Sequence, residues 1–175
     1  EWADDLIANG TICFTNISRF VADPYHGRGD PNEGKHILIR NGRPLTAQYS
    51  MPVYVWCCTM DIQVDRVHET WPDRNCVIQI LDTVKFARRI SQALGGQRPR
   101  LFPLHVGPVA YTKTDGGHEQ TDWADGLFQK DETYDGQKEF RFAIPACTGD
   151  EPKDHVVLRI GSCRDIVRIV LPVDP

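Results

Sequence analysis

The sequence predicts an α+β domain built on a mostly antiparallel sheet with few helices, and three observations lead to this class. Segments typical of strands outnumber segments typical of helices. The two kinds do not alternate regularly, which argues against a doubly wound parallel sheet. Three consecutive segments with a two-residue alternation of apolar and polar residues close the chain, at 138–144, 155–160 and 166–171. A chain of 175 residues can bury one core, so we expect a single domain, 1–175.

Composition limits the kinds of binding partner and the cellular compartment that we expect for this chain. The net charge of −4 gives the chain no general attraction to nucleic acid or to an anionic membrane. No apolar run approaches the ~20 residues of a membrane-spanning helix. The six cysteines include no Cys-x-x-Cys pair, and five of them lie in or beside apolar stretches, as small core residues do. We therefore expect reduced thiols and a cytoplasmic protein.

The first part of the chain contains one helix end, several strands and one long loop. Gly10 follows the helical segment 2–9 at the position where a left-handed residue commonly ends a helix. Residues 16–35 are rich in Asn, Asp, Gly and Pro and predict a long loop, which is uncommon without a function. The predicted strands are 11–14, 36–40 with a tight turn at 41–44, the apolar run 53–59 as a central strand, and 76–81.

The clearest helix is 82–96. Asp82 or Thr83 can cap its start, and Gly95-Gly96 ends it. The apolar residues that recur at helical spacing are Val84, Ala87, Ile90 and Leu94. A strand with a bend near Gly107-Pro108 follows at 105–113.

The strand at 138–144 has two unlike faces. One face consists of Phe140, Phe142 and Ile144, which predicts a buried side. The other carries a polar row, which consists of Gln137, Glu139 and Arg141. If the polar row faces water, Glu139 and Arg141 form an exposed ion pair of little energetic value. If it faces a cleft, a fixed and ionised carboxylate is suited to stabilising an oxocarbenium-like cation or to acting as a general base.

Two resemblances bear on this strand. Gln137-Lys138-Glu139 resembles the Gln-x-Glu triplet that mono-ADP-ribosyltransferases carry on a strand. A longer set of spaced residues resembles a widespread, largely uncharacterised bacterial and phage domain family whose C-terminal strand reads Gln/Glu-x-Glu-aromatic-Arg. The matching residues span 6–144 and are Leu6, Gly10, Ile12, Phe14, Thr15, Phe20, Asp23, Pro24, Trp71, the segment 109–113, Phe128, Lys130, Tyr134, Gln137, Glu139, Phe140 and Arg141.

The resemblance implies a bent, split antiparallel sheet like that of ADP-ribosyltransferases. It implies NAD as a substrate, transfer of ADP-ribose to an unknown acceptor or cleavage of NAD, and a place in toxin or phage-conflict biology. The residues it assigns are Glu139 for the ribosyl cation, Gln137 for the acceptor or an attacking water, Arg141 and Arg28 for the diphosphate, and Tyr111 and Tyr134 for the nicotinamide pocket. Such transferases use an Arg or His on a first strand to hold NAD, and no such strand precedes Trp2 here. Two alternatives stay open: the strand is missing from this sequence, or the site differs.

Other readings stay open. The main rival is a non-catalytic protein-interaction domain on the same scaffold, in which the polar row is a solvated face or a partner contact. The loop 20–34 is a candidate substrate loop or an ordinary solvated loop. A hydrolase, a nuclease or a cysteine nucleophile would draw on His26, His68, His105, His118, Cys57 and Cys58. No His-Glu-x-x-His or paired-Cys spacing is present, so we expect no metal site.

Overall fold

The computed structural model describes most of the chain, and the statements below concern that part. The described residues are 1–21, 30, 33, 35–40, 43–63, 66, 69, 76–95, 97, 99–112, 123–147, 149 and 151–170. At 35–40, 43–48, 123 and 125 the description covers the backbone alone.

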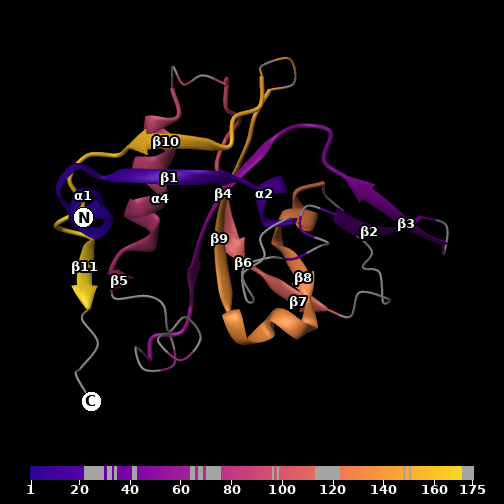
Figure 1. Ribbon diagram of the computed structural model, residues 1–175, viewed down its shortest axis with the longest axis horizontal. Helices are drawn as coiled ribbons and strands as arrows, with labels where there is room; N and C mark the ends of the chain where they lie inside the picture. Colours follow the sequence, from indigo (N-terminus) through magenta and orange to yellow (C-terminus); the bar gives the residue numbers. More distant parts are fainter. Residues whose placement is uncertain are drawn as a thin grey trace.

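Five strands form a central antiparallel sheet in the order β10-β1-β4-β9-β6 (Figure 1). They are β10 (His155–Arg159), β1 (Thr11–Asn16), β4 (Val53–Thr59), β9 (Glu139–Pro145) and β6 (His105–Pro108). The apolar run at 53–59 is the middle strand of the five, as predicted. The sheet changes direction between β1 and β4, where Thr15 pairs with Val55 and Asn16 pairs with Tyr54.

Three two-stranded sheets and a few helices complete the described fold. The sheets pair β5 (Val77–Ile80) with β11 (Val167–Val170), β2 (Lys35–Arg40) with β3 (Arg43–Gln48), and, in parallel, β7 (Ala110–Thr112) with β8 (Gln129–Asp131). The helices are α1 (Trp2–Asn9), α2 (Ser18–Val21), α4 (Thr83–Ala93) and the 3-10 helices η1 (Trp123–Phe128) and η2 (Glu132–Gln137). The predicted α+β class, with a mostly antiparallel sheet and few helices, is confirmed.

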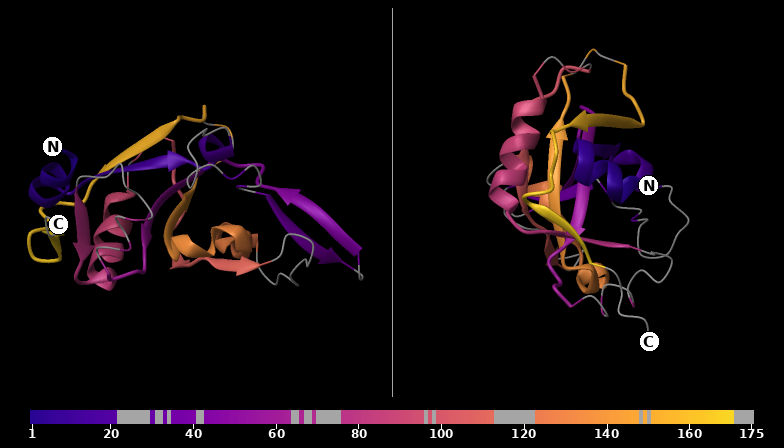
Figure 2. Two further views of the ribbon diagram at one scale, coloured as in Figure 1. Left: turned by 60° about the horizontal axis from the view of Figure 1, so that its bottom comes forward. Right: turned by 90° about the vertical axis from the view of Figure 1, so that its left-hand side faces the viewer.

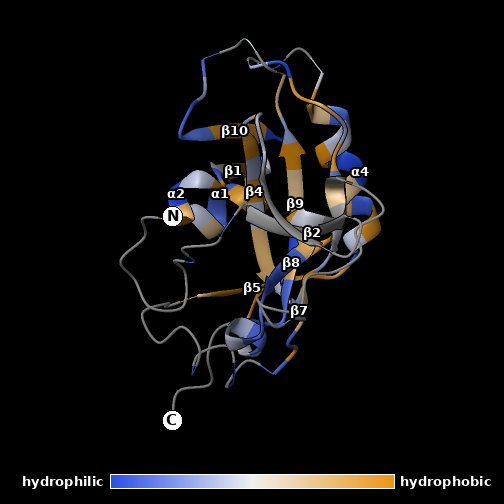
Figure 3. Ribbon diagram, turned by 90° about the vertical axis from the view of Figure 1, so that its right-hand side faces the viewer, coloured by the Kyte–Doolittle hydropathy of each residue, from blue (hydrophilic) through white to orange (hydrophobic). Residues whose placement is uncertain are grey.

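The main core lies between α4 and one face of the central sheet (Figure 2). Trp56 of β4, Phe86 of α4 and Phe142 of β9 pack as a trio, with ring centroids 5.5 to 5.6 Å apart. A smaller cluster covers part of the opposite face and contains Val53, Val55, Ala143, Leu127 and Ile17. Figure 3 shows the hydropathy of these elements along the chain, with the central strands among the more apolar ones. The sheet therefore has core on both faces near β4 and β9.

Several local predictions are confirmed. Gly10 follows α1 with a φ of 68°, in the left-handed region, and its N–H bonds to the carbonyl of Leu6. The carboxylate of Asp82 caps α4 by accepting a hydrogen bond from the backbone N–H of Lys85 at 2.8 Å. The strand predicted at 105–113 bends after Pro108, where the chain leaves the central sheet and continues as β7.

Two predictions on α4 need correction. Val84 is 71% exposed, because the buried stripe of the helix is set by Phe86 and Ile90, one turn apart, and Val84 lies on the other side. The helix ends at Ala93 with Leu94 as its cap, before the glycines that were predicted to end it. Within the described chain, no helix has both the length and the apolar character needed to cross a membrane.

Candidate functional site

The polar row begins in a turn and continues on a strand. β9 starts at Glu139, whereas Gln137 closes η2, so the prediction that Gln137 lies on the strand is wrong. Lys138 joins the two with a φ of 42°, a left-handed conformation that is uncommon for a residue with a side chain. This turn breaks the two-residue alternation, yet the side chains of Gln137 and Glu139 still meet at a common partner, described below.

The polar row is buried. The exposed fractions are 8% for Gln137, 6% for Glu139 and 1% for Arg141. On the apolar side, Phe142 and Ile144 are fully buried and Phe140 is half-buried. The interpretation of the row as a solvated face with an exposed ion pair is therefore wrong. The sequence alternates as a half-buried strand would, but a second layer made by η1, β8 and Glu33 covers the polar side.

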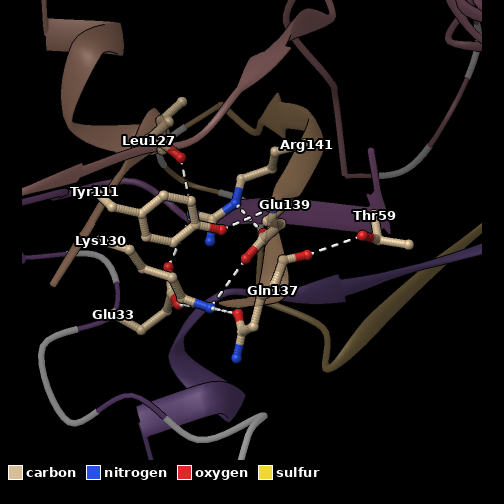
Figure 4. A network of polar contacts seen from close by, with 8 residues as sticks. All are labelled: Glu33, Thr59, Tyr111, Leu127, Lys130, Gln137, Glu139 and Arg141. Atoms are coloured by element: carbon tan, nitrogen blue, oxygen red, sulfur yellow. Dashed lines mark hydrogen bonds and ion pairs between the residues drawn. The ribbon is translucent and has the colours of Figure 1, made fainter. Parts of the chain in front are cut away.

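Four charged side chains, Glu33, Lys130, Glu139 and Arg141, form what we call the ionic cluster (Figure 4). Arg141 donates from Nε to Oε1 of Glu139 at 2.7 Å and from Nη1 to Oε1 of Glu33 at 2.8 Å. The same Nη1 donates to the carbonyl of Leu127 at 2.7 Å. Arg141 thus ties β9 to η1 and to the segment before β2.

Lys130 of β8 closes the ionic cluster from the other side. Its Nζ donates to Oε2 of Glu139 and to Oε1 of Gln137, both at 2.9 Å, and lies 3.5 Å from Oε2 of Glu33. Nζ also lies 5.2 Å from the centre of the Tyr134 ring, a distance typical of a cation–π contact. Lys130 is therefore the partner through which Gln137 joins Glu139.

The ionic cluster is electrically balanced, with two carboxylates and two cations. Burial opposes ionisation of Glu139, but the charges of Arg141 and Lys130 and the hydrogen bond from Arg141 outweigh it and lower its pKa to about 2. Burial also disfavours the charged form of Lys130, and the charges of Glu33 and Glu139 outweigh it and raise the pKa of Lys130. Glu139 is thus a carboxylate throughout the neutral range and is poorly suited to proton transfer there.

Of the remaining residues predicted for the site, some lie beside the ionic cluster and others lie outside the described residues. Tyr111 is beside Glu139, because its hydroxyl accepts a hydrogen bond from the backbone N–H of Glu139 at 2.7 Å. Burial raises the pKa of Tyr111, so the hydroxyl stays protonated. Thr59 fixes η2 by donating to the carbonyl of Gln137 at 2.9 Å. Arg28 lies outside the described residues, as do His26, His68 and His118.

The cysteines are free thiols, as predicted, although only Cys163 is fully buried. Cys57 lies opposite Arg141 in the β4–β9 register and retains exposed surface. Desolvation, followed by the charge of the nearby Glu139, raises the pKa of Cys57 well above its usual range. The same two causes raise the pKa of Cys58 to about 12. Both thiols are protonated at neutral pH, which disfavours a cysteine nucleophile.

No role is predicted from the sequence for Glu33 or Lys130, although both are central to the ionic cluster. Lys130 is one of the residues of the family resemblance, and Glu33 belongs to the candidate loop 20–34. Glu33 and Asp30 of that loop are buried, with exposed fractions of 5% and 3%. A polar stretch of sequence therefore contains two buried residues. For Glu33 the burial is explained by its ion pairs with Arg141 and Lys130, which are distant in the sequence.

The cluster can do two things chemically. A fixed carboxylate can offset positive charge on a ligand, or a balanced set of charges can join elements of the fold. In the described residues, no three His, Cys, Asp or Glu side chains are placed to hold a metal ion. Comparisons of the chain with protein-family models, with curated proteins and with solved structures find no match.

Proposed function

We propose that this chain is a non-catalytic protein-interaction domain in which the ionic cluster holds the scaffold together. The observation that carries the proposal is that both carboxylate oxygens of Glu139 are buried and already hydrogen-bonded to cations. One of its oxygens accepts from Arg141 and the other from Lys130, and its side chain is 7% exposed. A ribose hydroxyl could reach one of these oxygens only if a residue that covers Glu139 moved away, because so little of the side chain is exposed. If that residue were Lys130 or Arg141, a buried cation would lose a partner, which is costly.

The arrangement also supports a structural role energetically. Breaking a buried ion pair by removing one member costs about 3–5 kcal/mol, because the other charge stays buried and uncompensated. The cluster joins residues far apart in the chain: Glu33 before β2, Lys130 on β8 and Arg141 on β9. Such a set of contacts fixes how these elements pack, and a buried carboxylate that is paired with two cations needs no substrate to explain it.

The experiment is to incubate the purified domain with NAD carrying a label in nicotinamide and to count released nicotinamide. Glu139→Gln and the exposed-site control Asp165→Asn are measured alongside. Asp165 also pairs with two cations, Lys85 and Arg89, but its side chain is 46% exposed. We expect no release by any of the three proteins and no heat of NAD binding in calorimetry. Release by the wild type and by Asp165→Asn, but not by a folded Glu139→Gln, would overturn the proposal.

One observation favours a second candidate, an NAD-using enzyme similar to ADP-ribosyltransferases or an NAD-cleaving domain. Glu139 is ionised and fixed on a strand, next to the Tyr111 hydroxyl. The ammonium group of Lys130 bridges it to Gln137. A preorganised negative charge of this kind is what a developing ribosyl cation requires. In that case Lys130 would yield Oε2 to the ribose most easily, since it keeps Gln137 and Glu33 as partners. The labelled-NAD experiment separates the two candidates.

A further inference from the structure

The central sheet ends at β10, and part of the backbone of this strand faces away from its neighbour β1. Figures 1 and 2 show β10 on the outer side of β1. Two backbone hydrogen bonds frame the β1–β10 pairing. Ile160 N–H donates to the carbonyl of Gly10 at 3.0 Å, and Asn16 N–H donates to the carbonyl of Asp154 at 2.8 Å. In an antiparallel pair only every second residue bonds to the neighbouring strand. The even-numbered residues of β10 therefore bond to β1, and the odd-numbered ones direct their backbone groups away from it.

Three residues of β10 have such outward backbone groups, namely His155, Val157 and Arg159. The side chains of all three are exposed, and that of Val157 is 51% exposed. Val156 and Leu158, between them, are buried in the main core. In the described part of the chain, no hydrogen bond reaches the N–H or the carbonyl of the three outward residues. β10 thus presents a row of donors and acceptors beside an exposed valine, which is what the addition of another strand requires.

The opposite edge of the same sheet, β6, does not present such a row. Val109 N–H donates to the carbonyl of Glu139 at 2.9 Å, so the odd-numbered residues of β6 bond to β9. The outward residues of β6 are therefore Val106 and Pro108. Proline has no N–H, and proline on an edge strand is a common means of preventing further strand pairing. β10 contains no proline, so the two edges differ in their ability to accept another strand.

The outward row of β10 is complementary to itself. In an antiparallel pair of two β10 strands centred on Val157, this residue lies opposite Val157 of the partner subunit. His155 then lies opposite Arg159 of the partner subunit, and the reverse pair forms by symmetry. Each of the three pairs exchanges two hydrogen bonds, which gives every outward N–H and carbonyl of both strands a partner. The two valines, at the centre, form a cross-strand pair of β-branched residues, which is favourable in sheets.

We propose that two copies of this chain form a symmetric dimer by pairing their β10 strands about Val157, which joins the two central sheets into one. A second copy fits this edge because a two-fold interface uses the same surface on both subunits. The inference deepens the proposed interaction function, on which it rests, by naming the partner.

The first test is the mass in solution, by sedimentation and light scattering, of the wild type, Val157→Lys and Val157→Glu. Because Val157 pairs with itself, each variant alone places two like charges opposite each other. We expect a wild-type dimer and a dissociation constant raised at least ~10-fold in either variant alone. An equimolar mixture of the two variants should restore a heterodimer, since its central pair joins opposite charges. The side chain of Val157 is half exposed, so both variants should keep the urea midpoint of the folded monomer.

A second test compares proline at the two edges of the sheet. Val157→Pro removes an outward N–H from β10 and leaves the hydrogen bonds of β10 to β1 in place. Val106→Pro is the matched control, because it removes an outward N–H from β6, at a valine that is 38% exposed. We expect Val157→Pro to raise the dissociation constant at least ~100-fold, and Val106→Pro to dimerise like the wild type.

Several results would overturn the inference. A wild type that stays monomeric at high micromolar concentration would do so, as would a dimer that all three Val157 variants retain. Failure of the Lys and Glu variants to form a heterodimer would reject the pairing about Val157, and equal weakening by Val106→Pro would reject the choice of edge. A monomer that releases no nicotinamide from NAD would leave the proposed interaction function standing with another protein. Release of nicotinamide would reject that function, on which the inference rests, whatever the mass.

Discussion

Glu139 is ionised although it is buried, and its neighbours explain why. Burial is the largest single influence and favours the neutral acid, but Arg141 and Lys130 place two positive charges within 2.9 Å of its oxygens. Removing either cation would leave the cost of burying the Glu139 charge only partly offset. An Arg→Lys replacement at Arg141 is not conservative, because a single ammonium cannot reach Glu139, Glu33 and the Leu127 carbonyl with the geometry of a guanidinium.

The ionised state of Glu139 predicts a pH dependence of stability. Its pKa is lowered from 4.5 to about 2 on folding, so its contribution is fully present above about pH 5 and is lost as pH falls towards 2. A shift of this size corresponds to about 3 kcal/mol. We expect the difference in unfolding free energy between wild type and Glu139→Gln to shrink by roughly that amount between pH 5 and pH 2. A difference that stays constant across this range would show that the Glu139 charge contributes nothing to folding.

At the scale of elements, the junction of α1 with β1 depends on close backbone contact. Gly10 holds the left-handed turn between them, and its carbonyl accepts the backbone N–H of Ile160 at 3.0 Å. A Cβ at Gly10 would lie 2.0 Å from the carbonyl oxygen of Gly161, which is far inside contact distance. Glycine is therefore required here for both conformation and space.

Gly10→Ala is expected to lower the unfolding free energy by more than the ~1–3 kcal/mol of backbone strain, because the clash with Gly161 adds to it. Gly95→Ala is the matched control. No atom lies within 4 Å of a Cβ there and its φ is not in the left-handed region, so the change should be neutral or stabilising by up to ~1 kcal/mol. Urea unfolding of both variants measures this. Equal stability of the two variants would contradict the tight α1–β1 junction.

At the scale of the whole molecule, the sequence predicts the fold class, the strands of the central sheet and the caps at Gly10 and Asp82, because these depend on neighbouring residues. The middle position of β4, the left-handed Gly10 and the cap at Asp82 follow from apolar runs and turn chemistry. The alternation at β9 correctly separates Phe142 from Arg141. It does not say what covers the polar side, since a wet face and a face buried under charged partners give the same alternation.

The ionic cluster shows why the rest could not be predicted. Glu33 and Arg141 are 108 positions apart, and nothing local marks Glu33 as interior. The burial of Glu33 depends on Arg141 and Lys130 being present at the same place. The left-handed Lys138, which takes Gln137 off the strand, likewise has no glycine to mark it. Long-range pairing of charges and an unmarked turn are the two features that sequence patterns miss here.

If the ionic cluster is an interior support of the fold, removal of the Glu139 charge should lower the unfolding free energy, and Glu139→Gln at neutral pH tests this. Glutamine keeps the shape but removes the charge, which leaves Lys130 and Arg141 buried with one carboxylate, Glu33, between them. We expect a loss of about 3–5 kcal/mol. The control Asp165→Asn, exposed beside Lys85 and Arg89, should lose no more than ~1 kcal/mol. An equally small loss for Glu139→Gln would contradict the structural role of the ionic cluster and would make Glu139 a site carboxylate that the fold does not need.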